Sequence, residues 1–531
     1  ITWIHRALEL NTSEAAQTGN FERDEAIEAY RALRAGGATL VAIYLRYGDA
    51  KAALAALEKG DLVRVTPPGL VERLEHAAED DDPSAWSDLY RLFSSSEDAN
   101  RPETSMDPTL AKAAAFGCAV ELFRAEPRSL RGAGPLAVEL VDQGMAEVAP
   151  AVLTPALGNS PSAQDLSWTL SLTLRALLGE AEIGEHAAAR RTFKAAEGML
   201  ALADAQKLVG KVRPTPARLR YVMGVLETRA GDLGRARPLI AAAVQVEQTL
   251  EGLNMLAAID RQRGDAKAAL ASLDRVAALA RKSGDASAEA EAQILVFEIN
   301  RDQGNVAEAK SALDAALKSA LKARESSRSG SDQARSERVL ARVLEHFGAT
   351  QSAKRATDRA YEASRADTRQ LTATVLDASR RALTSGDLLT ARQALRQALD
   401  AGLAEEDLIY AALWLSLLER SMNATSDGST EEAFASIDDS GGWPAKLASW
   451  GRGKLTDEQL TKTARTRVQK TEAKFYAAMR RRAKGVGEIK KELTEVASSE
   501  TIELVEVTIA RDLLAREAPL PMKLPDGVAV P

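Results

Sequence analysis

Histidine is the side chain in this sequence with the broadest chemical repertoire, because imidazole transfers protons near neutral pH and also binds metals. The chain has four, at His5, His76, His186 and His346. No two of them are close enough in the sequence to present a pair of metal ligands on one helix. We therefore predict helix-surface or turn positions for all four, without a metal site or a role in proton transfer.

The single cysteine, Cys118, lies in a run of small and apolar residues at 113–120. Apolar surroundings keep a thiol protonated and unreactive. This context favours a buried structural residue over a nucleophile. Because there is only one cysteine, no disulfide can form within the chain.

Two short patterns are similar to ligand-binding loops, but each lacks an essential part. Gly453–Thr456 (GKLT) is similar to the end of a phosphate-binding loop, yet its Thr comes one residue late and the earlier Gly is missing. The acidic turn Glu79–Pro83 lacks the alternating spacing and the final Glu of a calcium loop. The sequence therefore predicts no enzyme: no catalytic residues, no cofactor and no metal.

A basic run, Arg480–Arg482 followed by Lys484, Lys490 and Lys491, has two interpretations. It could bind phosphate or an acidic partner. Alternatively, these are hydrated cations near a helix C-terminus, where the helix dipole favours positive charge. We prefer the second interpretation, because no aromatic residues interleave with the run. The net charge of −7 also argues against nucleic acid as a partner.

The elements that must position any site are defined by a recurring turn. A Gly followed by Asp or Asn separates two alanine-rich stretches. The Gly ends one helix in the left-handed conformation, and the Asp or Asn caps the next by accepting a backbone N–H. Small, large aliphatic and small residues then share one face of the second helix. The series is Gly231, Ala236, Ile240, Ala243; Gly264, Ala269, Leu273, Val276; Gly304, Ala309, Leu313, Ala316; and Gly386, Ala391, Leu395, Ala398.

These units resemble the tetratricopeptide repeat (TPR), a helix-turn-helix unit of about 34 residues. Gly224 and Gly231 are spaced like the family's two glycines, and Ala236 and Ala243 match its small positions in the second helix. The resemblance implies an all-α, TPR-like α-solenoid, a right-handed superhelix of helix-turn-helix pairs. An aromatic content of only 4% agrees with closely packed helices rich in Ala and Leu.

The organisation predicted along the chain follows the strength of this pattern. N-terminal helical repeats, a polar linker, degenerate TPR-like repeats and well-formed TPR repeats come first. A loop, a TPR-like cap and an extended Pro-rich tail follow. The ranges, in that order, are 1–93, 94–108, 109–210, 211–422, 423–442, 443–517 and 518–531.

The C-terminal block has its own character, with Trp443, Trp450, the Gly453–Thr456 turn and the pair Phe475 and Tyr476. It loosely resembles the closing segment of bacterial outer-membrane TPR lipoproteins, which act as adaptors for cell-wall enzymes. The simpler interpretation is a cap, in which these aromatic residues cover the last apolar face of the solenoid.

The resemblance to those lipoproteins favours a periplasmic or outer-membrane-associated location over a cytoplasmic one. No segment of the sequence is long and apolar enough to cross a bilayer. The chain begins at Ile1 rather than Met, which is compatible with a leader, lipid anchor or effector region upstream. We expect any membrane association to depend on such an anchor.

In the TPR resemblance, the first helix of each pair lines a concave groove. Counting back from each turn Gly places a row of arginines on this face, namely Arg261, Arg301, Arg338, Arg342 and Arg380. Guanidinium groups pair well with carboxylates, so the row suits an acidic peptide. The alternative is that these arginines pair with acidic residues of the solenoid itself, because Glu298 and Glu345 map to the same face.

Together these interpretations predict a non-catalytic scaffold or adaptor, which binds peptide segments or partner subunits in the groove. The alternative function is a regulatory or sensor solenoid of a larger signalling or ATPase-linked protein. The repeat pattern does not separate the two, because function depends on the groove and not on the helix-packing residues.

Overall fold

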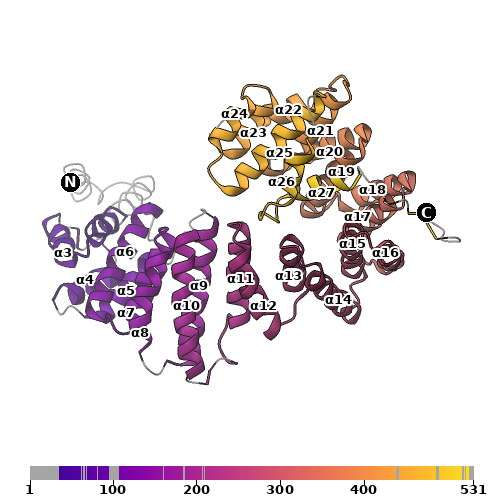
Figure 1. Cartoon of the computed structure of the whole chain (residues 1–531). Helices are drawn as coiled ribbons and strands as arrows, with labels where there is room; N and C mark the ends of the chain where they lie inside the picture. The colour runs from indigo at the N-terminus through magenta and orange to yellow at the C-terminus, as the bar shows by residue number, and fades with distance from the viewer. Residues whose placement is uncertain are drawn as a thin grey trace. The chain divides into compact units, whose positions relative to one another are not determined.

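The computed structural model describes residues 35–60, 62–63, 66, 68–79, 82–94, 107–158, 161–182, 186–205, 207–208, 210–437, 442–485, 489–516, 520 and 522–525. Within these ranges all regular structure is helical, which confirms the predicted all-α fold of consecutive helix pairs. The chain divides into two compact units, Ile1–Leu219 and Arg220–Pro531 (Figure 1).

The first unit is a series of helices in which each packs against the next along the chain. A helical stretch at 35–45 comes first and shares a core with the three helices that follow it and with α6. The helices are α3 (Ala50–Lys59), α4 (Pro68–Glu79), α5 (Pro83–Ser94), α6 (Pro108–Ala125), α7 (Leu130–Asp142), the short 3-10 helix η2 (Ala146–Val148), α8 (Ala149–Leu157), α9 (Ala163–Glu182) and α10 (His186–Ala205). Cys118 is buried in this core, as predicted.

The second unit contains the best-formed pairs, which pack in sequence order. Helix α11 (Pro216–Arg229) crosses the boundary between the units, and α12 (Leu233–Val246) follows it and packs against α13 (Leu250–Gln262). The pairs are α13 with α14 (Ala266–Ser283), α15 (Ala286–Asp302) with α16 (Val306–Ser326), α17 (Gly330–His346) with α18 (Thr350–Ser364), and α19 (Thr368–Ser385) with α20 (Leu388–Asp400). The remaining helices are α21 (Glu405–Ser421), α22 (Ser429–Ser436), α23 (Trp443–Gly451), α24 (Asp457–Thr463), α25 (Arg467–Ala483), α26 (Lys490–Ala497) and α27 (Val505–Arg516).

The turns between paired helices have the predicted conformation. Gly231 and Gly264 adopt φ values of 72° and 80°, in the left-handed region that a side chain disfavours. Asp265 then accepts a hydrogen bond from the backbone N–H of Ala268 at 3.0 Å, which caps the second helix. Asp232 and Asp387 cap their helices in the same way.

Asn305 departs from the predicted capping role. Its side chain makes no capping hydrogen bond at the start of α16. Instead, its Nδ2 donates to Asn300 Oδ1 at 3.2 Å, because the last turn of the preceding helix offers a side-chain acceptor. The turn after Gly304 is therefore fixed by an amide pair rather than by a cap.

The predicted packing stripe is buried in every pair. Ala236, Ala269 and Ala309 are inaccessible to solvent, and the aliphatic residues four positions later are also buried. Small side chains at these positions let the two helices approach closely. The offsets read from the sequence therefore identify the contact face correctly.

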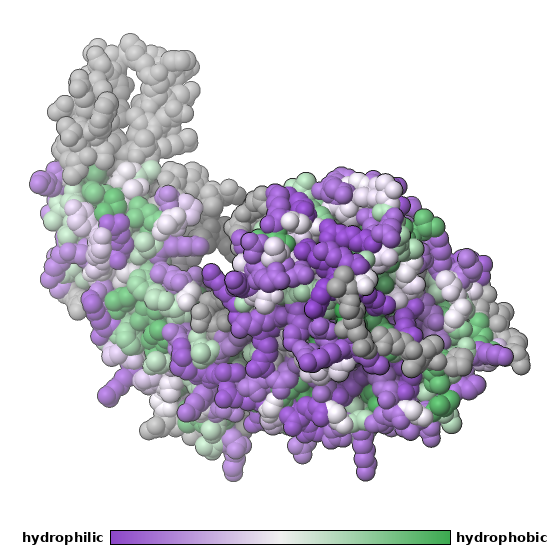
Figure 2. Space-filling view, turned by 45° about the horizontal axis from the view of Figure 1, so that its top comes forward, coloured by the Kyte–Doolittle hydropathy of each residue, from purple (hydrophilic) through white to green (hydrophobic). Residues whose placement is uncertain are grey.

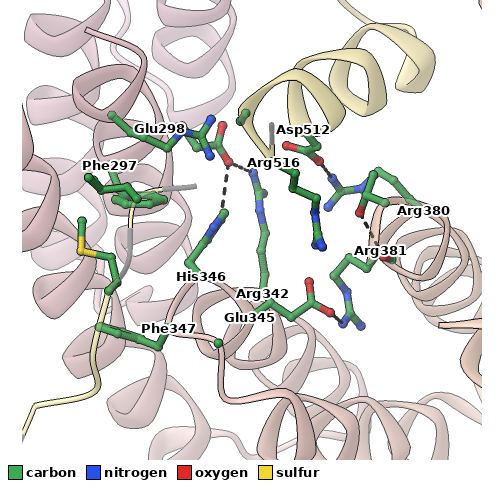
Figure 3. A pocket seen from close by; sticks show the side chains of 16 residues that line it. Phe297, Glu298, Arg342, Glu345, His346, Phe347, Arg380, Arg381, Asp512 and Arg516 are labelled. Atoms are coloured by element: carbon green, nitrogen blue, oxygen red, sulfur yellow. Dashed lines mark hydrogen bonds and ion pairs between the residues drawn. The ribbon is translucent and has the colours of Figure 1, made fainter. Parts of the chain in front are cut away.

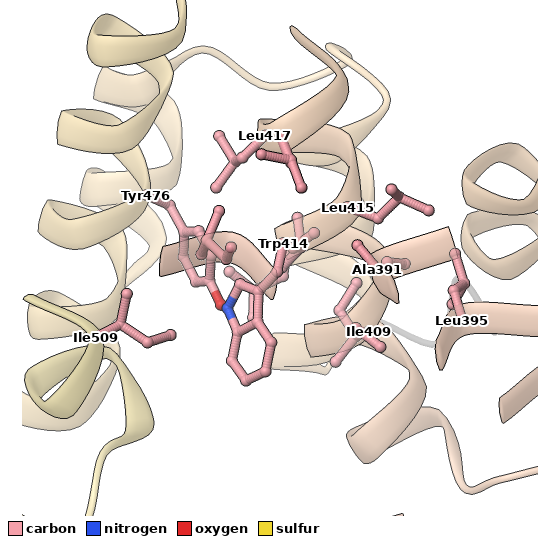
Figure 4. Close-up of a cluster of buried hydrophobic side chains, with 14 of the residues drawn as sticks. Ala391, Leu395, Ile409, Trp414, Leu415, Leu417, Tyr476 and Ile509 are labelled. Atoms are coloured by element: carbon pink, nitrogen blue, oxygen red, sulfur yellow. The ribbon is translucent and has the colours of Figure 1, made fainter. Parts of the chain in front are cut away.

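Large aromatic residues of α21, α23 and α25 form part of one hydrophobic core. Trp414, Trp450, Phe475 and Tyr476 are fully buried in one cluster, part of which is drawn in Figure 4. Trp450 Nε1 donates to Asp457 at 2.7 Å and the Tyr476 hydroxyl donates to Glu506 at 2.6 Å, whereas Trp414 Nε1 is buried without a hydrogen-bond partner among the described residues. The stretch predicted as a loop at 423–442 differs from expectation, because it contains the helix α22.

The chain after α26 returns to the repeat helices. The Gln262 amide on α13 donates to the carbonyls of Ala497 and Ser499, at 3.1 and 2.6 Å. Ile502 packs against the cluster formed by α12–α15. Beyond α27, Leu520, Met522 and Leu524 pack against the core of α15–α18 without regular secondary structure.

Among the described residues, none of the helices is both long and apolar enough to span a bilayer. The face seen in Figure 2 is largely hydrophilic, and hydrophobic residues occur on it in small separate groups. Hydrophilic side chains, rather than a broad apolar surface, therefore dominate this face.

Candidate functional site

Four of the five predicted arginines come together around α27. Arg261 lies on α13, Arg301 on α15, Arg342 on α17 and Arg380 on α19, so each is on the first helix of a pair. They line two pockets that α27 borders. We call this space the arginine groove. Arg338 lies outside both pockets.

Arg338 is held by neutral groups of the next pair. Its guanidinium donates to Gln370 Oε1 at 2.9 Å and to Thr374 Oγ1 at 3.1 Å. Burial lowers its pKa from the ordinary value, and the more distant Asp377 opposes that shift. This arginine therefore connects α17 to α19 and does not face the groove.

Glu298 is the central acid of the arginine groove. Its two carboxylate oxygens accept from Arg261 Nη1 at 2.9 Å and from Arg342 Nη2 at 2.5 Å. Burial alone would raise the pKa of Glu298, but the Arg342 and Arg261 guanidinium groups hold it well below its ordinary value. Two arginines from different pairs thus share one buried carboxylate, and this ion pair connects α13, α15 and α17.

A second charged cluster connects α19 to α27. Arg380 Nη1 donates to Asp512 Oδ2 at 2.6 Å, and its Nη2 donates to Asp377 Oδ1 at 3.2 Å. The neighbouring Arg381 bonds Asp377 and Glu345 at 2.8 and 2.6 Å. Burial opposes ionisation of Asp377, but the Arg381 and Arg380 charges lower its pKa. Asp512 therefore joins a network in which every carboxylate has a cationic partner.

The larger of the two pockets, about 400 Å³, contains a further arginine that the sequence did not predict as part of the site. Arg511 of α27 lines it together with Arg261. Burial first, and then the nearby Arg261 charge, lower the pKa of Arg511 to about 10. Four arginines and four carboxylates line this pocket, so its formal charges balance: Arg261, Arg342, Arg380 and Arg511 against Glu298, Asp377, Glu503 and Asp512.

The smaller pocket, about 300 Å³, lies at the other end of α27, between α15, α17 and α19 (Figure 3). Its wall includes His346, whose ring centroid lies 4.8 Å from that of Phe297. Burial lowers the pKa of His346 to about 3, so the imidazole is neutral at physiological pH. The prediction of a surface or turn position was wrong for this histidine. Its place four residues after Arg342 was the available signal, because residues four apart share a helix face.

The environments of the other described histidines and of the cysteine do not suggest a reaction. His76 is exposed, His186 is half-buried, and His5 lies outside the described residues. Burial raises the pKa of the Cys118 thiol. Among the described residues there is no group of His, Cys, Asp or Glu arranged to hold a metal ion.

The Gly453–Thr456 turn and Arg480 of the basic run have structural roles. Thr456 caps α24 in a reciprocal arrangement with Gln459, which explains the Gly-Lys-Leu-Thr pattern. Arg480 was expected to be hydrated, but its guanidinium lies 3.7 Å from the centre of the Trp450 ring. It also donates to the Trp450 carbonyl at 2.5 Å, so it is part of the cap.

Comparison with known proteins gives similarity of structure but not of sequence. No protein-family model matches the sequence, and no curated protein matches it. The closing segment's likeness to outer-membrane lipoproteins therefore gains no support.

The chain is similar to a Rap protein solved in complex with competence and sporulation factor, at 14% identity and a TM-score of 0.33, over 70% of this chain and 98% of that one. It is also similar to the P58(IPK) TPR domain, at 14% identity and a TM-score of 0.17, over 76% and 97% of the two chains. A circular tandem repeat protein matches at 14% identity and a TM-score of 0.15, over 90% and 97%.

Proposed function

We propose that this chain is a non-catalytic interaction scaffold, and that its arginine groove binds an acidic segment of a partner protein. The observation that carries the proposal is the pairing of Asp512 with Arg380 at 2.6 Å. Asp512 belongs to α27, a helix that is distant in sequence from the repeats it contacts. The groove thus already holds one carboxylate from a separate segment, in the way that we propose for a partner.

The side chains that would meet the partner are partly desolvated. Arg301, Arg342 and Arg380 have side-chain exposures of 14%, 25% and 11%. A charge-assisted hydrogen bond to such a group contributes about 1.5–3 kcal/mol, well above the value for a surface ion pair. An acidic segment that reaches two or three of them would gain useful affinity.

We expect the partner segment to displace the residues that follow α27, and not α27 itself. Helix α27 is anchored by fully buried residues, including Ile509 and Ala510. The tail is less firmly held, because Leu520 and Met522 are only half-buried. A partner segment with apolar residues at those two positions would replace the tail, and its acidic residues would lie beside the arginines.

A capture experiment tests the proposal. Partners captured from the native cells by the full chain would be identified by mass spectrometry, purified, and titrated against wild type, Arg301→Gln and Arg482→Gln. Arg301 pairs only with Asp302 among the described residues, and Asp302 is 42% exposed, so the first change strands no buried acid. Arg482 lies exposed at the end of α25, outside both pockets, and is the matched control.

We expect Arg301→Gln to weaken partner binding by about tenfold, the loss that one charge-assisted hydrogen bond would give. Arg482→Gln should bind like wild type. Equal affinities for all three proteins would contradict a role for the groove and would place the interaction surface elsewhere.

The alternative, a regulatory or sensor solenoid, predicts a site for a small ligand in addition to a protein surface. The pocket beside Arg301 and Arg342 supports this alternative, because its volume of about 300 Å³ suits a small molecule.

A further inference from the structure

The pocket at the C-terminal end of α27 has more positive than negative charge. Five arginines and three carboxylates line it: Arg301, Arg342, Arg380, Arg381 and Arg516, against Glu298, Glu345 and Asp512. The three carboxylates are each paired, with Arg342, Arg381 and Arg380 respectively. Two guanidinium groups, those of Arg301 and Arg516, therefore remain without a carboxylate from the pocket wall.

Arg516 is the unpaired one of these two cations, because Arg301 pairs with Asp302 outside the pocket wall. It extends from the last turn of α27 into the pocket, toward the space between Arg342 and Arg380 (Figure 3). Among the described residues it has no hydrogen-bond or ion-pair partner. An arginine directed at other arginines is unfavourable unless an anion lies between them.

The other arginines keep donor groups free for such an anion. Arg342 uses Nη2 for Glu298, and Arg301 uses Nε and Nη2 for Asp302. A guanidinium has five N–H donors, so Arg342 Nε and Nη1 and Arg301 Nη1 remain without a partner in the described residues. None of these atoms is both buried and without a partner, so each keeps contact with solvent.

The geometry points to a binding site for a phosphate group, held between Arg516 of α27 and the Arg301 and Arg342 side chains of α15 and α17. A phosphate has negative charge near neutral pH and several acceptor oxygens, which match the uncompensated charge of Arg516 and the free donors of the forked guanidinium groups. This site does not depend on the proposed partner protein, since every donor comes from the chain itself.

The pocket is larger than a phosphate ion and has an apolar part. Phe297, Phe347, Leu520 and Met522 form that part of its wall. A phosphomonoester with a small apolar group would therefore bind more tightly than inorganic phosphate. Either ligand would bridge α27 to the repeat helices and stabilise their contact.

Isothermal titration calorimetry on the full chain tests the site with two probes, inorganic phosphate and phenyl phosphate, at constant ionic strength. The proteins are wild type, Arg516→Gln, Arg301→Gln and the control Arg482→Gln. Arg516 is exposed, so its replacement should leave the fold intact, which circular dichroism verifies.

We expect saturable binding of one phosphate per wild-type chain and of the Arg482→Gln control. Binding should weaken by about tenfold in Arg516→Gln and in Arg301→Gln. Tighter binding of phenyl phosphate would identify a phosphomonoester as the ligand class, and equal binding would identify free phosphate.

Absence of saturable binding to wild type would overturn the proposal. So would wild-type affinity in both Arg516→Gln and Arg301→Gln, because the anion would then be bound elsewhere. Because this measurement uses the purified chain alone, its failure leaves the proposed partner-binding function untouched, and the capture experiment can fail without affecting it.

Discussion

Arg380 and Asp512 are separated by 132 residues in the sequence and joined by a hydrogen bond of 2.6 Å. One belongs to a repeat helix and the other to α27, so the pair holds the C-terminal helix in the arginine groove. Replacing Asp512 by Asn removes this ion pair and leaves Arg380 with Asp377 as its remaining acid.

We expect Asp512→Asn to lower the free energy of unfolding by about 1–3 kcal/mol, because the Arg380 side chain is only 11% exposed and loses a charged acceptor. Hydrogen exchange of the backbone amides in α27 should also become faster. Urea unfolding and exchange mass spectrometry measure the two effects. Asp142→Asn is the control, since its ion pair with Arg175 is half exposed on both sides and its loss should cost less than about 1 kcal/mol.

Reversing the charge of Arg342 should destabilise the protein strongly. The register of the repeats suggests that groove arginines could be reversed at no cost, but Arg342 shares the buried Glu298 with Arg261. Arg342→Glu would place two carboxylates together in the interior, and a broken buried ion pair costs about 3–5 kcal/mol. Thermal melting of Arg342→Glu and of the exposed Arg482→Glu compares the two. Similar melting temperatures would show that Glu298 is solvated.

The packing stripe predicts a contrast between two alanines of α14. Ala269 is fully buried against its partner helix, and Ala278 is exposed on the same helix. Ala269→Leu should lower the free energy of unfolding by about 1–3 kcal/mol, because added methylenes do not fit a close helix contact. Ala278→Leu should change it by less than about 0.5 kcal/mol. Urea denaturation of both variants would refute the assigned stripe if the losses were equal.

The buried acids of the C-terminal block predict a dependence of stability on pH. Glu472 accepts hydrogen bonds from Tyr410 and Trp443, and burial together with the nearby Glu506 raises its pKa to about 8. An acid with a raised pKa is protonated in the folded state, so its stabilising effect is complete below its ordinary pKa of 4.5. It is lost as the pH rises through about 8.

The melting temperature should therefore fall between pH 6.5 and about 9, and Glu472→Gln should reduce this fall. His346, with a pKa lowered from 6.5 to about 3, affects stability only below that window, where acid favours the unfolded state. A melting temperature that falls equally in wild type and Glu472→Gln across the window would show that Glu472 is ionised in the fold.

The parts of the fold that sequence reasoning predicts correctly are those fixed by neighbours in the chain. A Gly with positive φ, an Asp cap and a small residue one turn later all act within about a dozen residues, so Gly264, Asp265 and Ala269 suffice to define a turn and its helix contact. Asn305 shows the limit of such rules, because its amide prefers Asn300 over the cap position.

The candidate site was predictable only in part, for a related reason. The repeat register places Arg261, Arg301, Arg342 and Arg380 on one face, and the structure brings them to one groove. The same register also places Arg338 on this face, because it lies four positions before Arg342, but only Arg342 reaches the pockets. Nothing in the sequence of α27 indicates where it packs, so Asp512 and Arg516 could not be assigned.

The hydrogen bonds from Gln262 to Ala497 and Ser499 affect how the array of repeats unfolds. Helix pairs that touch only their neighbours lose structure piece by piece, from the ends inward. Here a helix near the start of the second unit is hydrogen-bonded to residues more than two hundred positions later. Local unfolding at one end of the unit therefore removes contacts from the other end. The second unit should accordingly melt in one cooperative step, with amides in α13 and α26 losing protection together.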